Sequence, residues 1–472
     1  MKKVLLVNAN TEKSPYPVPP LGLCLLAEHL KSFYNVAVYD GTFDEGKSLC
    51  LEVERFKPDY IGFSIRNIDD VVADCPVFYP YKIMQEFIDP VRNVTDRPLI
   101  LGGSGFSIFP GELMHLTGAD YGISGEGEET FLRLLQRLDH GHSPAGMPNI
   151  WCGAHTPSEK TTFLSLANAS DSCIDQKIDF EPYRTRGVYS IQTKRGCALG
   201  CIYCTYPCIE GTEYRFRHPD DIAREIRDAS ERLGDIVFEF VDSTFNEPPG
   251  HAEAVCEAII RSGSRLRLRT MGINPRHTNK RLFQLMQQAG FMQIDVTPDS
   301  ASAKMIRNLR KGFTMDDIRR TAGLIRETNM PTMWFFLFGG PGETMDTFLE
   351  TINFIDEFIN PEDLVYLAAG LRIYPGTPLW KRALRDQYIK PGTPLFYPPV
   401  FYFSPEIGKE KLNSLIREAA ATRYHCLHPT ETTPDAWMLE QALTMRREQG
   451  LQEPMFRTLL RIRKNQWMKG KR

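Results

Sequence analysis

Three cysteines, Cys197, Cys201 and Cys204, lie close together in the middle of this 472-residue sequence. Three and then two residues separate them, which is typical of a short loop. Soft thiolates select iron–sulfur clusters or zinc, and three thiolates can hold three irons of a [4Fe–4S] cube while the fourth iron stays open. A zinc site would need a fourth ligand such as Cys208, whose spacing matches no common zinc motif. The pattern predicts a [4Fe–4S] cluster; zinc or three reduced thiols are the alternatives.

Residues 188–395 have the pattern of a partial (β/α)6 barrel. Short apolar runs alternate with helical segments six times, from residues 189–193 to residues 364–367. The cysteine loop follows the first strand, and ligands of such barrels bind at the carboxyl ends of the strands. Polar or glycine residues occupy several of those ends, namely Asp242 after the second strand, Asp299 and Ser300 after the fourth, and Gly339 and Gly340 after the fifth.

Residues 1–142 predict a second α/β unit. Apolar runs separated by helical segments indicate a parallel, doubly wound sheet, which binds ligands at the carboxyl ends of its strands. Loops at 64–69, 101–106 and 124–128 follow three of these strands, and small residues in such loops let a ligand approach the backbone. A glycine loop alone is weak evidence, because many sheets use it only to turn. The candidate ligand-binding residues in these loops are Gly102, Gly103, Ser104, Gly125, Glu126 and Gly127.

The cysteine spacing, with Tyr203 before the last cysteine and the run Gly339-Gly340-Pro341-Gly342-Glu343-Thr344, resembles the radical S-adenosylmethionine (SAM) superfamily. The resemblance implies that the open iron binds the amino and carboxylate groups of SAM and that Tyr203 lies against the adenine. It implies that Asp242 accepts a hydrogen bond from the SAM amino group. The other SAM-binding positions it implies are Asp299 and Ser300 at the ribose and Gly339 and Gly340 at the adenine.

The N-terminal unit, with its Gly-Gly-Ser-Gly and Gly-Glu-Gly-Glu loops, resembles the cobalamin-binding domain of cobalamin-dependent radical SAM enzymes. The resemblance implies that the nucleotide tail of cobalamin runs past both loops, and that a branched residue at Gly103 abolishes binding. The Asp-x-His-x-x-Gly motif that gives cobalt a histidine ligand in cobalamin mutases is absent, and residues 8–20 contain no histidine. A domain that is only a structural remnant is the alternative.

Arg66 follows the third strand of this domain and is expected to face its ligand crevice. A guanidinium stays protonated and has no lone pair to offer cobalt. We therefore expect Arg66 near the lower face of the corrin, where it keeps that axial position of cobalt without a protein nitrogen. An ordinary salt bridge with Asp69 or Asp70 is the alternative interpretation.

With a [4Fe–4S] cluster, SAM and cobalamin, the resemblance implies a methyltransferase that moves a methyl group from SAM via methylcobalamin to a carbon of a small molecule. It favours an aromatic heterocycle of a natural-product pathway as that small molecule. A non-methylating rearrangement or oxidative cyclisation stays open. Methylthiotransferases carry a second cysteine triplet, whereas Cys24, Cys50 and Cys75 are scattered. A cluster-bearing binding protein without activity is the non-enzymatic alternative, and the presence of both Asp242 and Asp299 argues against it.

Composition gives no sign of a nucleic-acid partner, because 56 Lys and Arg nearly balance 59 Asp and Glu. The locally basic residues 461–472 are interpreted as solvated surface. No run of eighteen apolar residues occurs, and eleven cysteines without an export signal indicate reduced thiols. We expect a cytoplasmic protein with a small-molecule substrate, an external electron donor such as flavodoxin or ferredoxin, and no nucleic-acid or membrane partner.

The predicted fold class is α/β throughout, with four segments. A Rossmann-like cobalamin-binding domain covers residues 1–142, and a proline-containing linker covers 143–187. The radical SAM barrel of the TIM type covers 188–395, and a small C-terminal helical domain covers 396–472.

Overall fold

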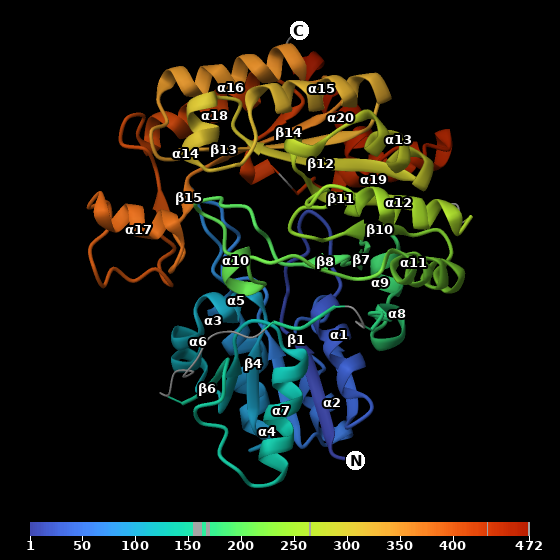
Figure 1. The fold of residues 1–472 in the computed structure, drawn as a ribbon, viewed down its shortest axis with the longest axis vertical. Helices are drawn as coiled ribbons and strands as arrows, with labels where there is room; N and C mark the ends of the chain where they lie inside the picture. Colours follow the sequence, from blue (N-terminus) through green and yellow to red (C-terminus); the bar gives the residue numbers. More distant parts are fainter. Residues whose placement is uncertain (154–162, 167–169, 264–265, 432, 471–472) are drawn as a thin grey trace.

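The computed structural model describes residues 1–153, 163–166, 170–263, 266–431 and 433–470. Two α/β units are stacked along the long axis of the molecule, with the N-terminal unit at the bottom of Figure 1 and the barrel at the top. Both units have sheets of mainly parallel strands, as predicted. None of the helices in the described part of the chain has the length and apolar character needed to span a bilayer.

The N-terminal sheet has six strands in the order β2-β1-β3-β4-β5-β6. The first five are parallel, and β6 runs antiparallel to β5. Since β3, β4 and β5 are neighbours, the three loops that follow them lie at one edge of the sheet. The strands are β1 (Lys3–Asn8), β2 (Asn35–Asp40), β3 (Tyr60–Ser64), β4 (Leu99–Gly102), β5 (Tyr121–Ile123) and β6 (Ile150–Cys152).

Helices cover both faces of this sheet, because successive residues of a strand point to opposite faces and both sets are apolar. Val4 and Leu6 of β1 pack with one group of helices, whereas Leu5 and Val7 pack with the other. The first group is α1 (Leu21–Leu30) and α7 (Glu128–Asp139). The second is α2 (Leu49–Phe56), α3 (Tyr79–Ile83), the π-helical turn Met84–Ile88, α4 (Asp89–Val94), α5 (Ser104–Ile108) and α6 (Pro110–Thr117).

The segment predicted as a linker, residues 143–187, is more than a connection. Its β6 extends the N-terminal sheet, so the sheet continues beyond the predicted boundary at residue 142. The segment also holds two short helices, α8 (Ile174–Lys177) and α9 (Glu181–Arg184), while its residues 154–162 and 167–169 lie outside the described residues. A three-residue strand carries too little periodic signal to be predicted from the sequence.

The barrel sheet has seven parallel strands in the order β17-β14-β13-β12-β11-β10-β7. Six of them are the predicted barrel strands. The seventh, β17, comes from the C-terminal segment that was predicted to be a purely helical cap, and it pairs with β14. The strands are β7 (Tyr189–Ile191), β10 (Val237–Phe240), β11 (Arg267–Ile273), β12 (Phe291–Asp299), β13 (Thr332–Phe338), β14 (Leu364–Ala369) and β17 (Cys426–Leu427).

Outside this sheet, β8 (Lys194–Arg195) pairs with β9 (Arg215–Phe216), and β15 (Leu371–Arg372) pairs with β16 (Phe401–Tyr402). Helix α17 (Pro378–Arg385) projects from the body at the left of Figure 1. The remaining helices are α10 (Tyr206–Ile209), α11 (Pro219–Leu233), α12 (His251–Arg261), α13 (Lys280–Ala289), α14 (Ala303–Asn308), α15 (Met315–Thr328), α16 (Met345–Phe358), α18 (Lys409–Thr422), α19 (Ala436–Gln449) and α20 (Met455–Gly470), with single 3-10 turns at Pro275–His277 and Pro429–Glu431.

Candidate active site

The cysteine loop begins where β8 leaves its partner β9. Gly196 opens the loop with φ +90°, and a Cβ added there would lie 2.0 Å from the carbonyl oxygen of Glu213. Only glycine fits such a position. The backbone N–H of Cys197 then donates to the carbonyl oxygen of Gly211 at 3.0 Å, which holds the loop against the hairpin.

The three cysteine side chains share one shielded environment. Cys197 is buried, and Cys201 and Cys204 are half-buried. Burial raises the pKa of Cys204 to about 12, and the adjacent Cys201 and Cys197 add to the rise. Iron would replace these protons, because the thiolate is the metal ligand. Among the described residues, no three His, Cys, Asp or Glu side chains converge on the place of a single ion. A cube takes each thiolate on a separate iron, so this donor set fits a [4Fe–4S] cluster.

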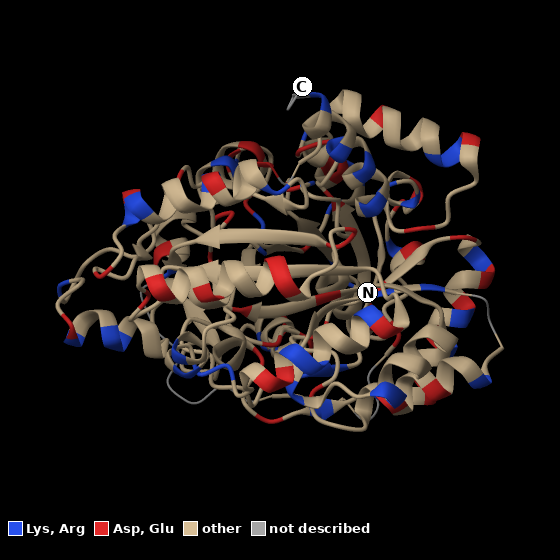
Figure 2. Ribbon diagram, turned by 90° about the horizontal axis from the view of Figure 1, so that it is seen from above, with Lys and Arg blue, Asp and Glu red and all other residues tan. Residues whose placement is uncertain are grey.

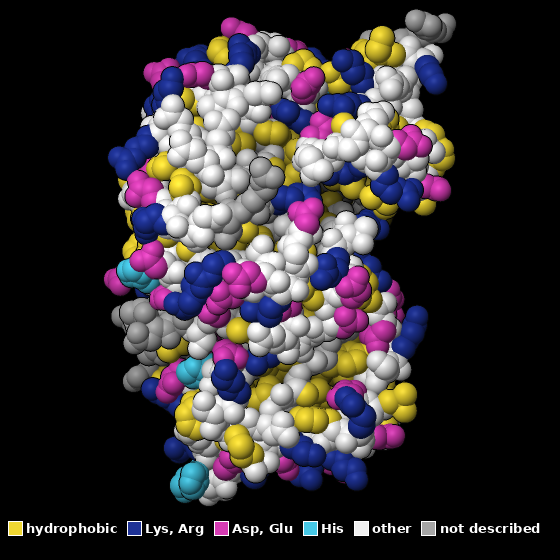
Figure 3. All heavy atoms as spheres, turned by 90° about the vertical axis from the view of Figure 1, so that its right-hand side faces the viewer, with side chains coloured by type: hydrophobic (Ala, Val, Ile, Leu, Met, Phe, Trp, Pro, Cys, Tyr) yellow, Lys and Arg dark blue, Asp and Glu magenta, His cyan; other side chains and the backbone are white. Residues whose placement is uncertain are grey.

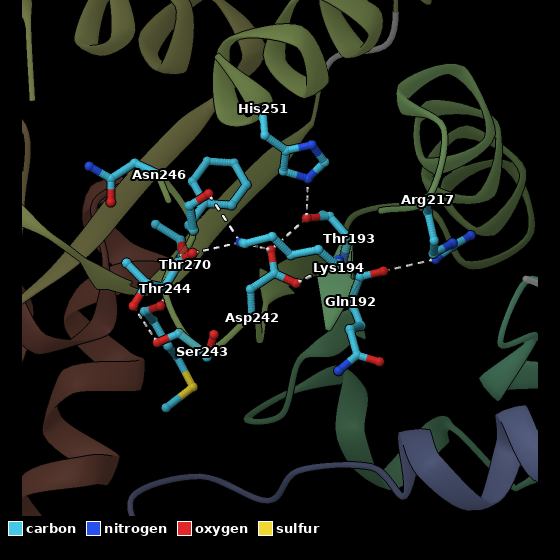
Figure 4. A network of polar contacts seen from close by, with 12 residues as sticks. Gln192, Thr193, Lys194, Arg217, Asp242, Ser243, Thr244, Asn246, His251 and Thr270 are labelled. Carbon is cyan, nitrogen blue, oxygen red and sulfur yellow. Dashed lines mark hydrogen bonds and ion pairs between the residues drawn. The ribbon is translucent and has the colours of Figure 1, made fainter. Parts of the chain in front are cut away.

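A buried polar network fixes the chain just before the cysteine loop (Figure 4). The carboxylate of Asp242 accepts hydrogen bonds from the backbone N–H of Thr193 at 2.7 Å and from its hydroxyl at 2.6 Å. Nζ of Lys194 lies 3.3 Å from the same carboxylate and donates to the carbonyl oxygen of Thr244 at 2.6 Å. The ring of His251 lies 2.8 Å from the Thr193 hydroxyl. Asp242 thus anchors the loop, and its contact with SAM stays a prediction that would add to, or replace, these bonds.

Tyr203 and Asp299, predicted at the adenine and the ribose, are in direct contact. The phenol of Tyr203 donates to the carboxylate of Asp299, and Nζ of Lys311 lies 2.8 Å from that carboxylate. Asp299 has φ +62°, a conformation that few residues other than glycine adopt and that functional sites often retain. Lys311 is buried and was not predicted; a lysine between Arg310 and Gly312 in a loop gives no sequence signal of its own.

The other predicted SAM positions lie deeper. Ser300 is buried, and its hydroxyl lies 3.1 Å from that of Thr351. A Cβ added to Gly340 would meet the side chains of Leu309 and Met305 at 2.9 and 3.0 Å. The lack of a side chain at Gly340 therefore allows α14 to pack closely against this loop. Gly339 has φ +95° and lies against Leu412. Contacts of Ser300, Gly339 and Gly340 with SAM stay predictions.

The glycine loops of the N-terminal domain surround one cavity of about 230 Å³. It lies between the sheet, α1 and α7, with apolar side chains such as Leu25 and Phe131 in its wall. A Cβ added to Gly127 would meet nothing within 4 Å, and one added to Gly102 would meet only the carbonyl oxygen of Ile123 at 3.8 Å. The missing side chains therefore leave space for a ligand. The loop residues that line the cavity are Gly102, Gly103, Ser104, Gly125, Glu126 and Gly127, which are the predicted set.

Gly103 also has a structural reason to be glycine. Its φ is +99°, and a Cβ would lie 2.6 Å from the carbonyl oxygen of Ile65. A branched residue at Gly103 would therefore disturb the loop itself, and a loss of cobalamin in that variant would not identify a ligand contact. Gly102 is the more informative position.

Glu126 and its neighbour Glu128 join the two domains. Glu126 lies 2.7 Å from Arg215 and 3.6 Å from Arg195, and Glu128 lies 2.6 Å from Arg195. Both arginines belong to the hairpin that carries the cysteine loop. The predicted cofactor residue Glu126 is thus buried in an ion-pair network that links the glycine loop to the cysteine loop.

Arg66 has no ion pair within the described chain, and Asp69 and Asp70 have other partners. Its Nε donates to the side-chain oxygen of Asn67 at 3.3 Å. Asp69 pairs with Arg372 at 2.9 Å, whereas Asp70 accepts hydrogen bonds from backbone N–H groups. The salt-bridge alternative is therefore not observed. Burial lowers the pKa of Arg66. Arg66 is not among the residues that line the cavity of the glycine loops, so its position under a corrin stays a prediction.

The inward face of the barrel carries a polar cluster that the sequence reasoning missed. Arg269 of β11 contacts Glu239 of β10 at 2.6 Å, and Asp295 of β12 lies nearby with its pKa raised by burial to about 7. Tyr16, from the loop after β1 of the other domain, donates to Glu239 at 2.7 Å and lies over Arg269 at 3.9 Å. Part of the signal was available, because Glu239 and Asp295 are each a charged residue flanked by apolar ones, whereas Arg269 is followed by Thr270.

Aromatic and sulfur-containing side chains lie further along the same inward face. Phe335 of β13 and Tyr366 of β14 have ring centroids 5.6 Å apart, and both are half-buried. Met271 of β11 is 45% exposed although it lies in a barrel strand. The barrel strands therefore carry half-buried aromatic side chains as well as the charged cluster.

Comparison with known proteins agrees with this two-domain arrangement. A model of the B12 binding domain matches residues 7–135, and a model of the radical SAM superfamily matches residues 191–355. The tryptophan 2-C-methyltransferase of Streptomyces laurentii is 26% identical over 443 residues, which cover 79% of this chain and 73% of that protein.

Two solved structures have the same fold over nearly the whole chain. The radical SAM methyltransferase TsrM from Kitasatospora setae, with cobalamin and a [4Fe–4S] cluster bound, has a TM-score of 0.82 and 24% identity, covering 100% of this chain and 99% of that one. The cobalamin-dependent radical SAM enzyme OxsB has a TM-score of 0.74 and 16% identity, covering 99% and 71%.

Fold and site together define a radical SAM enzyme with a B12-binding domain. The chain carries a B12 binding domain and a radical SAM domain and is similar to cobalamin-dependent radical SAM methyltransferases; the cofactors of these domains are a [4Fe–4S] cluster, SAM and cobalamin. The predicted class, fold and cofactors are confirmed, whereas the individual site residues stay predictions supported by their positions.

Proposed function

We propose that the protein methylates a ring carbon of a planar aromatic small molecule bound between its two domains. The observation that carries this proposal is that the two carboxyl-end surfaces face each other. Three loops of the N-terminal domain reach the barrel, through the pairs Tyr16–Glu239, Asp69–Arg372 and Glu128–Arg195. When bound, SAM supplies the methyl group and cobalamin carries it to the substrate.

The chain's own residues hold the reacting groups in place and exclude water. The Asp242–Lys194 pair has no solvent exposure and fixes the start of the cluster loop. The glycine-lined cavity would hold the nucleotide tail of cobalamin, and Gly102, Gly125 and Gly127 would leave room for it. Burying the site between two domains strengthens each of these polar contacts, because the local dielectric is low.

The inward face of the barrel supports an aromatic substrate. Phe335 and Tyr366 can stack on a planar ring, and Met271 adapts to irregular shapes. Arg269, Glu239 and Asp295 can form hydrogen bonds or ion pairs with polar substituents of that ring. The similarity to an enzyme named for methylation of tryptophan makes indoles and other nitrogen heterocycles the first substrates to test. In this proposal an external one-electron donor serves the enzyme in the cytoplasm, and no nucleic acid or membrane takes part.

The test is an anaerobic reaction of the reconstituted enzyme with SAM that carries a deuterated methyl group, and with tryptophan, indole and pyrrole derivatives. A product that contains the deuterated methyl group on carbon supports the proposal. A rearranged or cyclised product without the label would establish the alternative, a non-methylating reaction. Cys204→Ala should give no product, whereas Cys208→Ala, an exposed cysteine outside the predicted cluster set, should be active.

A further inference from the structure

The cysteine loop is held on one side of the molecule by two helical segments. The backbone N–H of Ile202, between the second and third cluster cysteines, donates to the carbonyl oxygen of Leu309 at the end of α14, at 3.2 Å. The backbone N–H of Leu379 in α17 donates to the carbonyl oxygen of Ile202 at 2.8 Å. The three side chains belong to the same apolar cluster. Whatever docks on α14 and α17 is therefore next to the cluster loop.

These two segments carry exposed cations. Arg307 and Arg310 flank Leu309, and Lys381 follows Leu379. All three are exposed, and within the described chain none of them forms an ion pair. Lys381 lies close enough to Cys208 for its charge to oppose the rise in thiol pKa that burial causes. We call Arg307, Arg310 and Lys381 the basic face.

The basic face differs from the opposite side of the molecule. The whole chain has a formal net charge of -3, and on the opposite side of the molecule, drawn in Figure 3, basic and acidic side chains are interspersed. Around α17, at the left of Figure 2, Lys and Arg predominate. The nearby Asp386 is occupied by Arg382 and Arg385, at 3.1 and 3.0 Å.

We propose that the basic face is the docking site of an acidic, FMN-bearing one-electron donor protein of the flavodoxin class. This inference rests on the proposed function, because that function requires an electron for the cluster. One electron passes from the flavin hydroquinone, which becomes the semiquinone, to the oxidised cluster, which becomes the reduced form; no bond forms or breaks. Complementary charge steers such encounters and makes their rate dependent on salt.

The test uses the holoenzyme and a purified acidic flavodoxin. Arg307→Glu/Lys381→Glu reverses two charges of the basic face on well-formed helices; Arg310 is left unchanged because its φ is +55°. Lys47→Glu/Arg186→Glu is the matched control, since it makes the same change in net charge at two other exposed cations that have no ion pair in the described chain. Oxidation of flavodoxin hydroquinone is followed by stopped-flow absorbance, and the Kd by fluorescence of the oxidised FMN, at low and high salt.

At low salt, the basic-face variant should bind flavodoxin at least about 10-fold more weakly and accept its electron correspondingly more slowly, and the difference should shrink at high salt. The control should behave as the unmodified enzyme. Equal losses in both variants, or no loss in either, would overturn the docking site. Iron content and reduction by dithionite should be unchanged in both variants. Methyl transfer driven by dithionite is measured separately, so that failure of the proposed function is distinguished from failure of the docking site.

Discussion

Gly102→Val tests whether the glycine-lined cavity binds cobalamin, because the conformation of the loop does not require glycine at this position. Gly102 ends β4 with an ordinary φ, and an added Cβ would meet only the carbonyl oxygen of Ile123 at 3.8 Å. Glycine in a strand costs about 0.5–1 kcal/mol relative to alanine, so Val at this position should keep or raise the free energy of unfolding of the cofactor-free protein. The added methyl groups would enter the cavity of about 230 Å³.

In the cobalamin complex the same methyl groups should meet the nucleotide tail. Overpacking typically costs about 1–3 kcal/mol, which corresponds to a rise in Kd of roughly 5- to 150-fold. Equilibrium dialysis with hydroxocobalamin gives the Kd, and thermal unfolding of the cofactor-free protein gives its stability. The expected result is a higher Kd for hydroxocobalamin in a cofactor-free protein whose thermal stability is unchanged or higher.

Two further glycine variants complete the comparison. Gly323→Val, on α15, adds a side chain that meets nothing within 4 Å far from the cavity and should leave the Kd unchanged. Gly103→Val should lose stability as well as cobalamin, because of its φ of +99°. An unchanged Kd in Gly102→Val would refute the assignment of the cavity, and so would a loss of binding that only follows a loss of stability.

Three other changes test separate parts of the site. Lys194→Met breaks a buried ion pair with Asp242, so the free energy of unfolding should fall by about 3–5 kcal/mol in denaturant titrations; a change below about 1 kcal/mol would contradict the anchoring role. Burial raises the pKa of Glu343 to about 7; this carboxyl therefore stabilises the fold below its unfolded pKa of about 4.5 and loses that contribution as pH rises through about 7. Glu343→Gln should make the fall in stability between pH 5 and 7 shallower by up to about 1.4 kcal/mol per pH unit, and an unchanged slope would rule this out. Electron paramagnetic resonance of the cob(II)alamin form should show no nitrogen superhyperfine splitting, and Arg66→His should change the spectrum; nitrogen splitting in the unmodified protein would disprove the predicted role of Arg66.

The sequence predicted the site wherever the chemistry is local. Three cysteines at fixed spacing and the glycines after β4 and β5 are contiguous motifs, and alternating strands and helices place them at strand ends. The adjacency of the loops after β3, β4 and β5 follows from the strand order, which a doubly wound sheet makes predictable.

The partners of the charged residues could not be predicted, because distant segments supply them. Asp69 pairs with Arg372, 303 residues away, and Tyr16 reaches Glu239 in the other domain. Glu126 lines the predicted cofactor cavity, but the sequence could not show that its carboxylate is paired with Arg215. Strands β6 and β17, with three and two residues, are defined by pairing with a neighbour rather than by their own pattern.

The central claim is that one chain holds an iron–sulfur cluster and a cobalamin at the junction of its two domains. Iron and cobalt analysis after anaerobic reconstitution tests it most directly. The account predicts about four irons and one cobalt per chain in the unmodified protein and in Cys208→Ala, and loss of iron with retention of cobalt in the Cys197→Ala/Cys201→Ala/Cys204→Ala variant. Iron retained by that triple variant, or no cobalt bound by the unmodified protein, would contradict the account.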